Sequence, residues 1–201
     1  MKLFAIGAFA VATLVAPAAF AQTAPAAPAA PSNPGPVIAG VCVYNHSRTL
    51  AQSTVGQSVL AGMNRLQTEV SGELQPYQTS IQTEAAALQQ AGSSLPQDQI
   101  QSRSQALQAR YREAQQLAET RDGELRYTDM KQREAIAAAV DPILSALYVE
   151  RGCGILLARE NAVLFANPAM DITDTVIQRL NVALPSLSFN RMTPPADQAQ
   201  Q

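Results

Sequence analysis

The sequence predicts an α+β protein in which a small β-body carries a long antiparallel hairpin of α-helices, a coiled-coil arm. A short β-branched segment stands near the start of the chain, at 37–44, and residues 154–166 near its end are predicted to form an antiparallel hairpin of two strands joined by a tight turn. Between them lie about a hundred residues of almost purely helical sequence with narrow apolar seams. Because such a small number of strands cannot bury a core alone, we expect another element or another chain to complete the body.

The first residues are typical of an export signal. Lys2 precedes an apolar run at 3–15, and small residues stand at the end of the segment. We expect a signal peptide at 1–21, cleaved between Ala21 and Gln22, and export of the mature chain. The alternative is an uncleaved N-terminal anchor.

The segments beside the folded part are expected to lack regular structure. Residues 22–36 contain five prolines among alanines, which predicts an extended linker. Residues 190–201 are polar and predict a disordered tail. A second long apolar run does not occur, so we expect no integral membrane segment in the mature form.

Length and composition predict one domain at 37–189, with the body at 37–58 and 148–189 and the arm at 59–147. The chain has no Trp, and aromatic residues make up 5% of it. The formal net charge of −2 does not favour a nucleic-acid partner.

Two cysteines, Cys42 and Cys153, both lie in apolar, strand-like sequence. In an oxidising compartment this even count is compatible with a disulfide that joins the first strand to the start of the 154–166 segment. The alternative is two separate buried side chains that never meet.

Helix starts are marked by capping residues. After the strand at 37–44, Asn45 or Ser47 is suited to cap a short helix. Ser53 or Thr54 marks the start of the first long helix.

The first long helix carries a seam with spacings of three and four, typical of a coiled coil. One additional spacing of four, between Val70 and Leu74, is a stutter. Gly72 and Pro76 lie beside it and are predicted hinges. The seam residues are Val59, Met63, Leu66, Val70, Leu74, Tyr77, Ile81 and Leu88.

Gly92 and Pro96 predict a turn, after which a return helix runs to about Glu150. Gly123 is a third predicted hinge. The expected buried side of the return helix consists of Leu107, Tyr111, Ala114, Leu117, Leu125, Ile136, Val140, Leu144 and Leu147. A compact four-helix bundle is the alternative, but a bundle needs wider apolar faces.

Two motifs make the prediction more specific. Residues 47–56 read SRTLAQSTVG after a strand and resemble the RVLxESxxG opening of the Skp/OmpH periplasmic chaperones. Residues 161–166, NAVLFA, and 171–181, DITDTVIQRLN, resemble the closing hairpin and DITxxVIxRLN helix of that family. The resemblance spans about 37–184, and Asn45 stands where the family commonly has Asp.

This resemblance implies a periplasmic location and an ATP-independent holdase that binds unfolded outer-membrane β-barrel proteins and uses no cofactor. It also implies a homotrimer with a jellyfish-like form, in which three chains build one β-body. The three strand segments of this chain, 37–44, 154–159 and 162–166, independently call for closure across chains. The expected assembly core is Val41, Val43, Leu50, Ile155, Leu157, Val163, Phe165, Ile172, Val176 and Leu180.

The arm departs from the strongly basic family members, because residues 74–102 contain no Lys or Arg. A lipopolysaccharide site at the arm tips is therefore not supported. Arginines gather on the return helix, interleaved with acids. They form either a client-facing patch or a solvated, salt-bridged face. They are Arg103, Arg110, Arg112, Arg121, Arg126 and Arg133.

The sequence does not favour an enzyme. His46 is the only histidine, and neither metal-ligand spacing nor a nucleophile–base set accompanies it. A phosphate-cradling GxxxxGK run does not occur either. Asp171 and Asp174 are typical of carboxylates at a helix start. The competing function is a periplasmic coiled-coil adaptor of an envelope complex.

Overall fold

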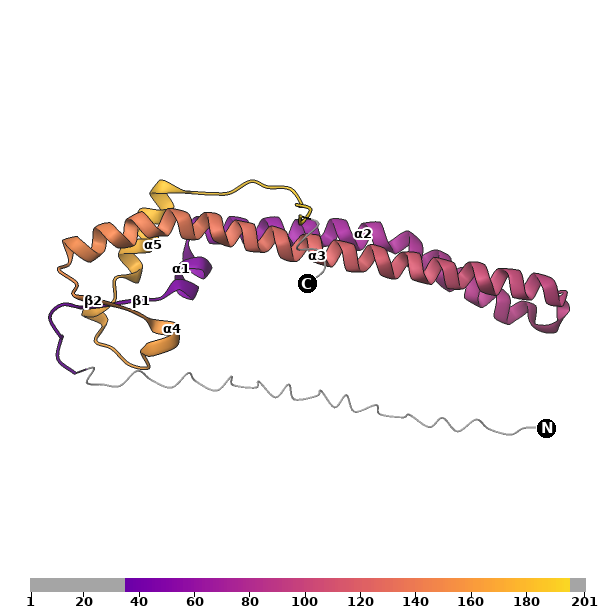
Figure 1. Cartoon of the computed structure of the whole chain (residues 1–201), viewed down its shortest axis with the longest axis horizontal. Coiled ribbons are helices and arrows are strands. Elements are labelled where there is room, and N and C mark those ends of the chain that lie inside the picture. The colour runs from indigo at the N-terminus through magenta and orange to yellow at the C-terminus, as the bar shows by residue number, and fades with distance from the viewer. Residues whose placement is uncertain (1–34, 196–201) are drawn as a thin grey trace, which may run out of the picture. The chain divides into compact units, whose positions relative to one another are not determined.

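The computed structural model describes residues 35–195. The predicted signal peptide, its cleavage position, the linker up to residue 34 and residues 196–201 lie outside the described residues. Within the described part, the chain is mostly helical with one small strand pair (Figure 1). Its elements are β1 (Val41–Tyr44), α1 (His46–Gln52), α2 (Thr54–Ala91), η1 (Gly92–Ser94), α3 (Gln97–Glu150), β2 (Ile155–Ala158), α4 (Arg159–Ala162), η2 (Pro168–Met170) and α5 (Thr173–Ala183).

Strands β1 and β2 pair in parallel, with Val41 opposite Ile155 and Tyr44 opposite Ala158. The expected antiparallel hairpin at 154–166 is therefore wrong. Only its first half forms a strand, and 163–166 lie outside any strand. Helix α4 replaces the expected tight turn. Glu160 anchors this helical turn, because its Oε1 accepts a hydrogen bond of 2.6 Å from the Ser47 backbone N–H.

Strand β1 is enclosed on both sides. Opposite β2, Val43 forms a parallel bridge with Asp171, and the Ile172 N–H donates to the Val43 carbonyl at 2.9 Å. The Val43 side chain is fully buried. This placement brings the two ends of the domain together at one short strand.

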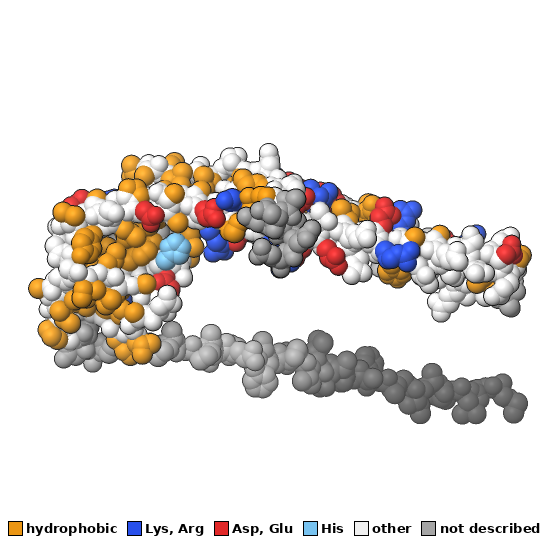
Figure 2. All heavy atoms as spheres, viewed as in Figure 1, with side chains coloured by type: hydrophobic (Ala, Val, Ile, Leu, Met, Phe, Trp, Pro, Cys, Tyr) orange, Lys and Arg blue, Asp and Glu red, His pale blue; other side chains and the backbone are white. Residues whose placement is uncertain are grey.

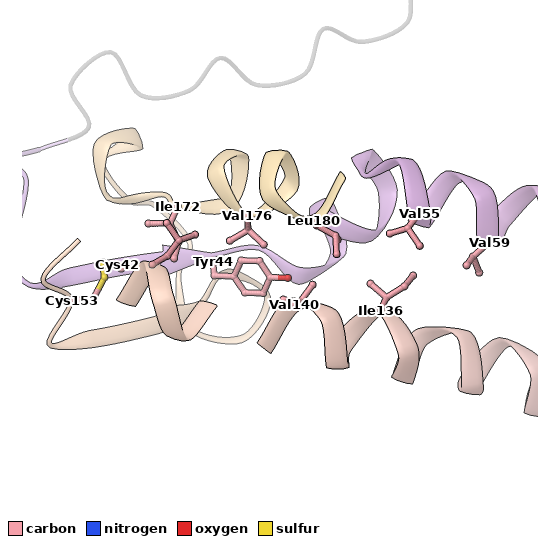
Figure 3. Packing of buried hydrophobic residues seen from close by; sticks show 11 residues of the cluster. Cys42, Tyr44, Val55, Val59, Ile136, Val140, Cys153, Ile172, Val176 and Leu180 are labelled. Carbon is pink, nitrogen blue, oxygen red and sulfur yellow. A yellow bond between two sulfur atoms is a disulfide. The ribbon is translucent and has the colours of Figure 1, made fainter. Parts of the chain in front are cut away.

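The hydrophobic core joins the body to the base of the arm. Figure 3 shows side chains from β1, α2, α3 and α5 converging on one cluster. The expected residues Val43, Ile172, Val176 and Leu180 are all buried, whereas Leu50 is half-buried and packs against the cluster. The cluster consists of Cys42, Tyr44, Val55, Val59, Ile136, Val140, Leu147, Cys153, Ile172, Val176 and Leu180.

Cys42 and Cys153 form a disulfide in the structure, with their Cα atoms 5.7 Å apart. The bridge spans 111 residues, including the whole arm. In the chain-entropy account, closing a loop of this size stabilises the fold by ~4–5 kcal/mol.

Three side chains cap the helices where α1 and α2 begin. Asn45 Oδ1 accepts from the Arg48 N–H at 2.7 Å, and Ser53 Oγ accepts from the Gly56 N–H at 3.1 Å. Asn181 of α5 adds a cap from a distance, because its Oδ1 accepts from the Thr54 N–H at 2.8 Å. Capping residues from both ends of the domain therefore fix the position at which the arm leaves the body.

Helices α2 and α3 run side by side as a two-stranded arm (Figure 1), not as the compact bundle that was the alternative. Val59, Leu66, Val70 and Ile81 of the expected seam are buried. Both helices continue without a break through their internal prolines. On α3 the expected burial of Tyr111 is wrong, since the side chain is 53% exposed.

A C-terminal segment at 184–192 follows α5 and returns along the arm in extended conformation (Figure 1). The expectation of a disordered tail from Asn190 does not hold for its first residues. Arg191 is held by two carboxylates, and the Met192 N–H donates to Thr128 Oγ1 at 2.8 Å. Arg191 therefore has partners on both helices of the arm. The polar composition of residues 190–201 gives no indication of these partners.

The α1–α2 junction yields a stability prediction. A Cβ on Gly56 would overlap the carbonyl oxygen of Leu50, which is a backbone atom and cannot turn aside as a flexible side chain can. We expect Gly56→Ala to lower the free energy of unfolding by about 1–3 kcal/mol, measured by urea denaturation.

Gly72→Ala is the matched control, because a Cβ there meets nothing within 4 Å. It should leave stability unchanged or raise it by up to ~1 kcal/mol through helix propensity. Equal effects of the two substitutions would contradict the close α1–α2 approach.

Candidate functional site

The arginines of α3 are the first candidate surface, and most of them are paired. Arg103 lies 3.8 Å from Glu84, Arg110 lies 4.0 Å from Glu113, and Arg133 lies 2.7 Å from Asp129. Arg126 pairs with Asp122, one turn away. The guanidinium of Arg110 also lies 6.0 Å from the centre of the Tyr77 ring.

Among the described residues Arg112 has no ion pair. Figure 2 shows blue and red side chains interspersed along the visible face of the arm. The arrangement is that of a solvated, salt-bridged surface, and such exposed pairs contribute little stability. It does not assemble the arginines into one cationic patch on that face.

A different charged cluster lies where the C-terminal segment meets the arm. Arg121 of α3 contacts Glu73 of α2 at 2.6 Å and Glu124 at 3.0 Å. Arg191 of the C-terminal segment contacts the same two carboxylates, at 2.8 and 2.9 Å. The four side chains form an ionic cage that ties three segments of the chain together.

Hydrogen bonds in this cage shift the affinity of its groups for protons. Those from Arg191 and then Arg121 hold the pKa of Glu73 below its ordinary value. The hydrogen bond to Glu73 raises the pKa of Arg121. Glu124 is buried, so its charge depends on these two arginines for compensation.

The C-terminal segment also makes apolar contacts beside the cage. Leu187 and Phe189 pack against the core cluster. A Cβ on Gly62 of α2 would lie 2.6 Å from Cζ of Phe189, so the ring occupies the space that a side chain would fill. Sequence reasoning missed this contact, although the alternation of Leu187, Phe189 and Arg191 with polar residues was one signal of it.

The predicted hinge positions lie close to the ionic cage. Gly72 precedes Glu73, and Gly123 precedes Glu124. Cβ atoms on these two glycines would meet nothing within 4 Å. Pro76 lies one turn further along α2, and the helix is continuous at all of these positions.

The body exposes a second candidate surface. Ile155 on β2 is 54% exposed, and Leu164 and Phe165 are 89% and 75% exposed. Within the described part of the chain, β2 has β1 as its one strand partner. Figure 2 shows apolar side chains gathered over this end of the molecule. Of the expected assembly residues, Val41, Leu157 and Val163 are half-buried.

A hollow of about 310 Å³ lies where α1 meets the arm. Its lining is mostly apolar and includes Leu50, Leu60 and Met63. The Asp129–Arg133 pair forms its polar edge. His46 lies apart from this lining, and its Nδ1 is 3.4 Å from the Tyr44 hydroxyl.

Over residues 35–195, no group of three or more His, Cys, Asp or Glu side chains is arranged to hold a metal ion. In the same range no helix is both long enough and apolar enough to cross a membrane. Asp171 instead serves the start of α5: its Oδ1 accepts from the Thr173 N–H at 2.9 Å. Arg48 pairs with both Asp171 and Asp174.

Comparisons with known proteins give a consistent result. A family model described as "Outer membrane protein (OmpH-like)" matches residues 40–180, which include the body and the whole arm. A crystal structure of an OmpH-like protein from Caulobacter crescentus, assigned there as an outer membrane chaperone, is 32% identical in sequence. The match covers 82% of this chain and 96% of that one, with a TM-score of 0.71. A search of curated proteins found no match.

The ionic cage yields a prediction on pH. Because the pKa of Glu73 is lowered in the folded state, its contribution is present above the unfolded value of 4.5 and is lost as pH falls. We expect Glu73→Gln to lower the free energy of unfolding by up to about 1 kcal/mol near neutral pH.

The difference from the unmodified protein should shrink as pH falls below 4.5, measured by urea denaturation across the pH range. Glu134→Gln, which removes an exposed partner of Lys131, is the control and should change stability less than Glu73→Gln does. A Glu73→Gln difference that does not change with pH would contradict the assigned role of the carboxylate.

Proposed function

The chain belongs to the OmpH-like family of outer membrane proteins, and from that premise we propose that it is an ATP-independent periplasmic holdase chaperone. Its clients would be unfolded outer-membrane β-barrel proteins, which it encloses between helical arms during transit. The family supports a chaperone role in general. The observation that carries the proposal is that the match includes the arm as well as the body.

The physical basis of this function is a surface that binds an unfolded chain and catalyses no reaction. An unfolded β-barrel precursor exposes apolar side chains and strand edges that aggregate. A protein that binds the unfolded form holds it soluble by mass action. The distal arm, with its polar surface and narrow seam, is suited to weak contacts with such a chain.

We propose that three copies assemble through the body. The exposed side chains of Ile155, Leu164 and Phe165, together with the open edge of β2, support this assembly. Another copy would cover the apolar surface and pair the edge.

We place the arm hinges at the level of the ionic cage. Gly72 and Gly123 allow bending there, because neither position carries a side chain that packs on the other helix. The part of the arm nearer the body is tied by Arg191, whereas the part beyond is free to adjust to client size.

The trimer proposal predicts a mass in solution. Light scattering should give three times the monomer mass for the mature protein. Phe165→Asp should shift the population toward the monomer, because it places a charge in the buried interface. Tyr111→Asp, on the exposed arm, is the control and should leave the mass unchanged. A stable monomer of the unmodified protein would sink the assembly proposal.

The holdase proposal predicts suppression of aggregation. The purified mature protein should keep a urea-denatured outer-membrane β-barrel protein soluble on dilution, without nucleotide, as followed by turbidity. Suppression should grow with chaperone concentration up to a several-fold excess of trimer. If the barrel protein aggregates at the same rate with and without the chain, the adaptor function is favoured instead.

A further inference from the structure

The C-terminal segment 184–192 is bound to the arm in the manner of a peptide in a groove. Ser58 Oγ of α2 accepts from the Leu187 N–H at 3.0 Å. Arg65 Nη2 of α2 donates to the Phe189 carbonyl at 2.8 Å, and Thr128 Oγ1 of α3 accepts from the Met192 N–H at 2.8 Å. All three contacts reach main-chain atoms, so they do not depend on the side chains of the bound segment.

The hydroxyls that receive this segment are held in place by the arm itself. Ser58 Oγ also donates to the Val55 carbonyl at 2.8 Å, and Thr128 Oγ1 donates to the Glu124 carbonyl at 2.7 Å. Because each hydroxyl hydrogen is engaged with the arm, the two oxygens are left to accept from an incoming N–H. The groove offers an ordered set of acceptors and one cation to any extended chain.

Side chains of the segment alternate between the groove and solvent. Ser186, Ser188 and Asn190 are exposed, whereas the side chains between them turn to the arm. The Phe189 ring sits over Gly62. Arg191 enters the ionic cage, where Glu73, Glu124 and Arg121 alone sum to a charge of −1. The groove therefore fits an aromatic side chain followed two residues later by a cation.

The floor of the groove is polar where a coiled coil is normally apolar. Thr128 and Gln132 are buried on α3 and continue, at spacings of four, the row formed by Ile136 and Val140. Glu124 is buried on the same row. Thr128 and Glu124 have partners within the arm, and the C-terminal segment adds the Met192 N–H to Thr128 and the Arg191 guanidinium to Glu124.

We propose that this groove is a binding site for extended client segments, and that the C-terminal segment occupies it as an internal competitor. The preferred occupant has alternating apolar side chains and a basic residue after an aromatic one. The inference rests on the proposed function, because strands of outer-membrane barrels alternate apolar and polar residues. The C-terminal segment lies beyond residues 40–180, which the family model matches.

Competition by a tethered segment sets the affinity for clients. A short tether gives an effective concentration of about a millimolar, which a free client segment must overcome. Loosening the C-terminal segment should therefore increase binding at the groove without altering the groove itself.

The test uses a fluorescent peptide with the sequence of residues 184–192, followed by anisotropy with the full mature chain. Phe189→Ser removes the ring from its place over Gly62 and loosens the internal segment. This variant should bind the peptide about tenfold or more tightly than the unmodified protein. Adding Gly62→Leu to that variant fills the aromatic position and should abolish the gain.

Two altered peptides test the specificity. One carries serine in place of its phenylalanine, and the other carries glutamate in place of its arginine; both should bind at least about tenfold more weakly. A peptide from a barrel strand with the same alternation should compete, and its scrambled form should not. Equal binding of all these peptides would overturn the proposal.

A measurement on the unmodified protein covers the case in which Phe189→Ser does not fold. Excess peptide should speed hydrogen exchange at the Leu187 and Met192 amides, because it displaces the internal segment. If these amides stay protected under saturating peptide, the proposal is wrong. It is also wrong if the protein forms dimers by exchanging its C-terminal segments.

Peptide binding does not depend on the aggregation assay. A chain that suppresses aggregation while Phe189→Ser gains no peptide affinity refutes the groove and leaves the holdase function intact. A chain that binds the peptide as expected but fails to suppress aggregation refutes the holdase function and retains the peptide site.

Discussion

The enclosure of strand β1 is the constraint on which the rest of the molecule depends. Val43 pairs with β2 on one side and with Asp171 on the other, so segments from both ends of the domain meet at four residues. This arrangement sets the direction of α1, and through Ser53 and Asn181 it sets where α2 begins. The arm is therefore a long helical insertion between β1 and β2, and the body sets its orientation.

Features that depend on local chemistry could be predicted from the sequence. The caps at Asn45 and Ser53, the turn at Gly92 and the start of α3 after Pro96 all lie where the residue types indicated. Each involves groups within a few positions of one another, so the sequence contains both partners. The seam of α2 could be predicted for the same reason, because its period is a property of one helix.

Features that depend on distant partners could not be predicted. The strand expected at 162–166 has suitable residues, but the contact of Glu160 with Ser47 selects a helical turn before it. The C-terminal segment has a polar composition typical of a tail, but Arg191 finds its carboxylates on α2 and α3. One signal was available: the polar residues of α3 at the spacing of its buried row indicate that a polar partner covers them.

The tight turn at η1 has a consequence for the order of folding. Partners across the arm are near in sequence at the tip and distant at the base: 36 residues separate Tyr77 from Glu113, 48 separate Glu73 from Arg121, and 111 separate the cysteines. Because loop closure costs more for longer loops, the two helices should zip from the tip toward the body. The strand pair and the disulfide would then form last, once the zipped arm has brought their ends together.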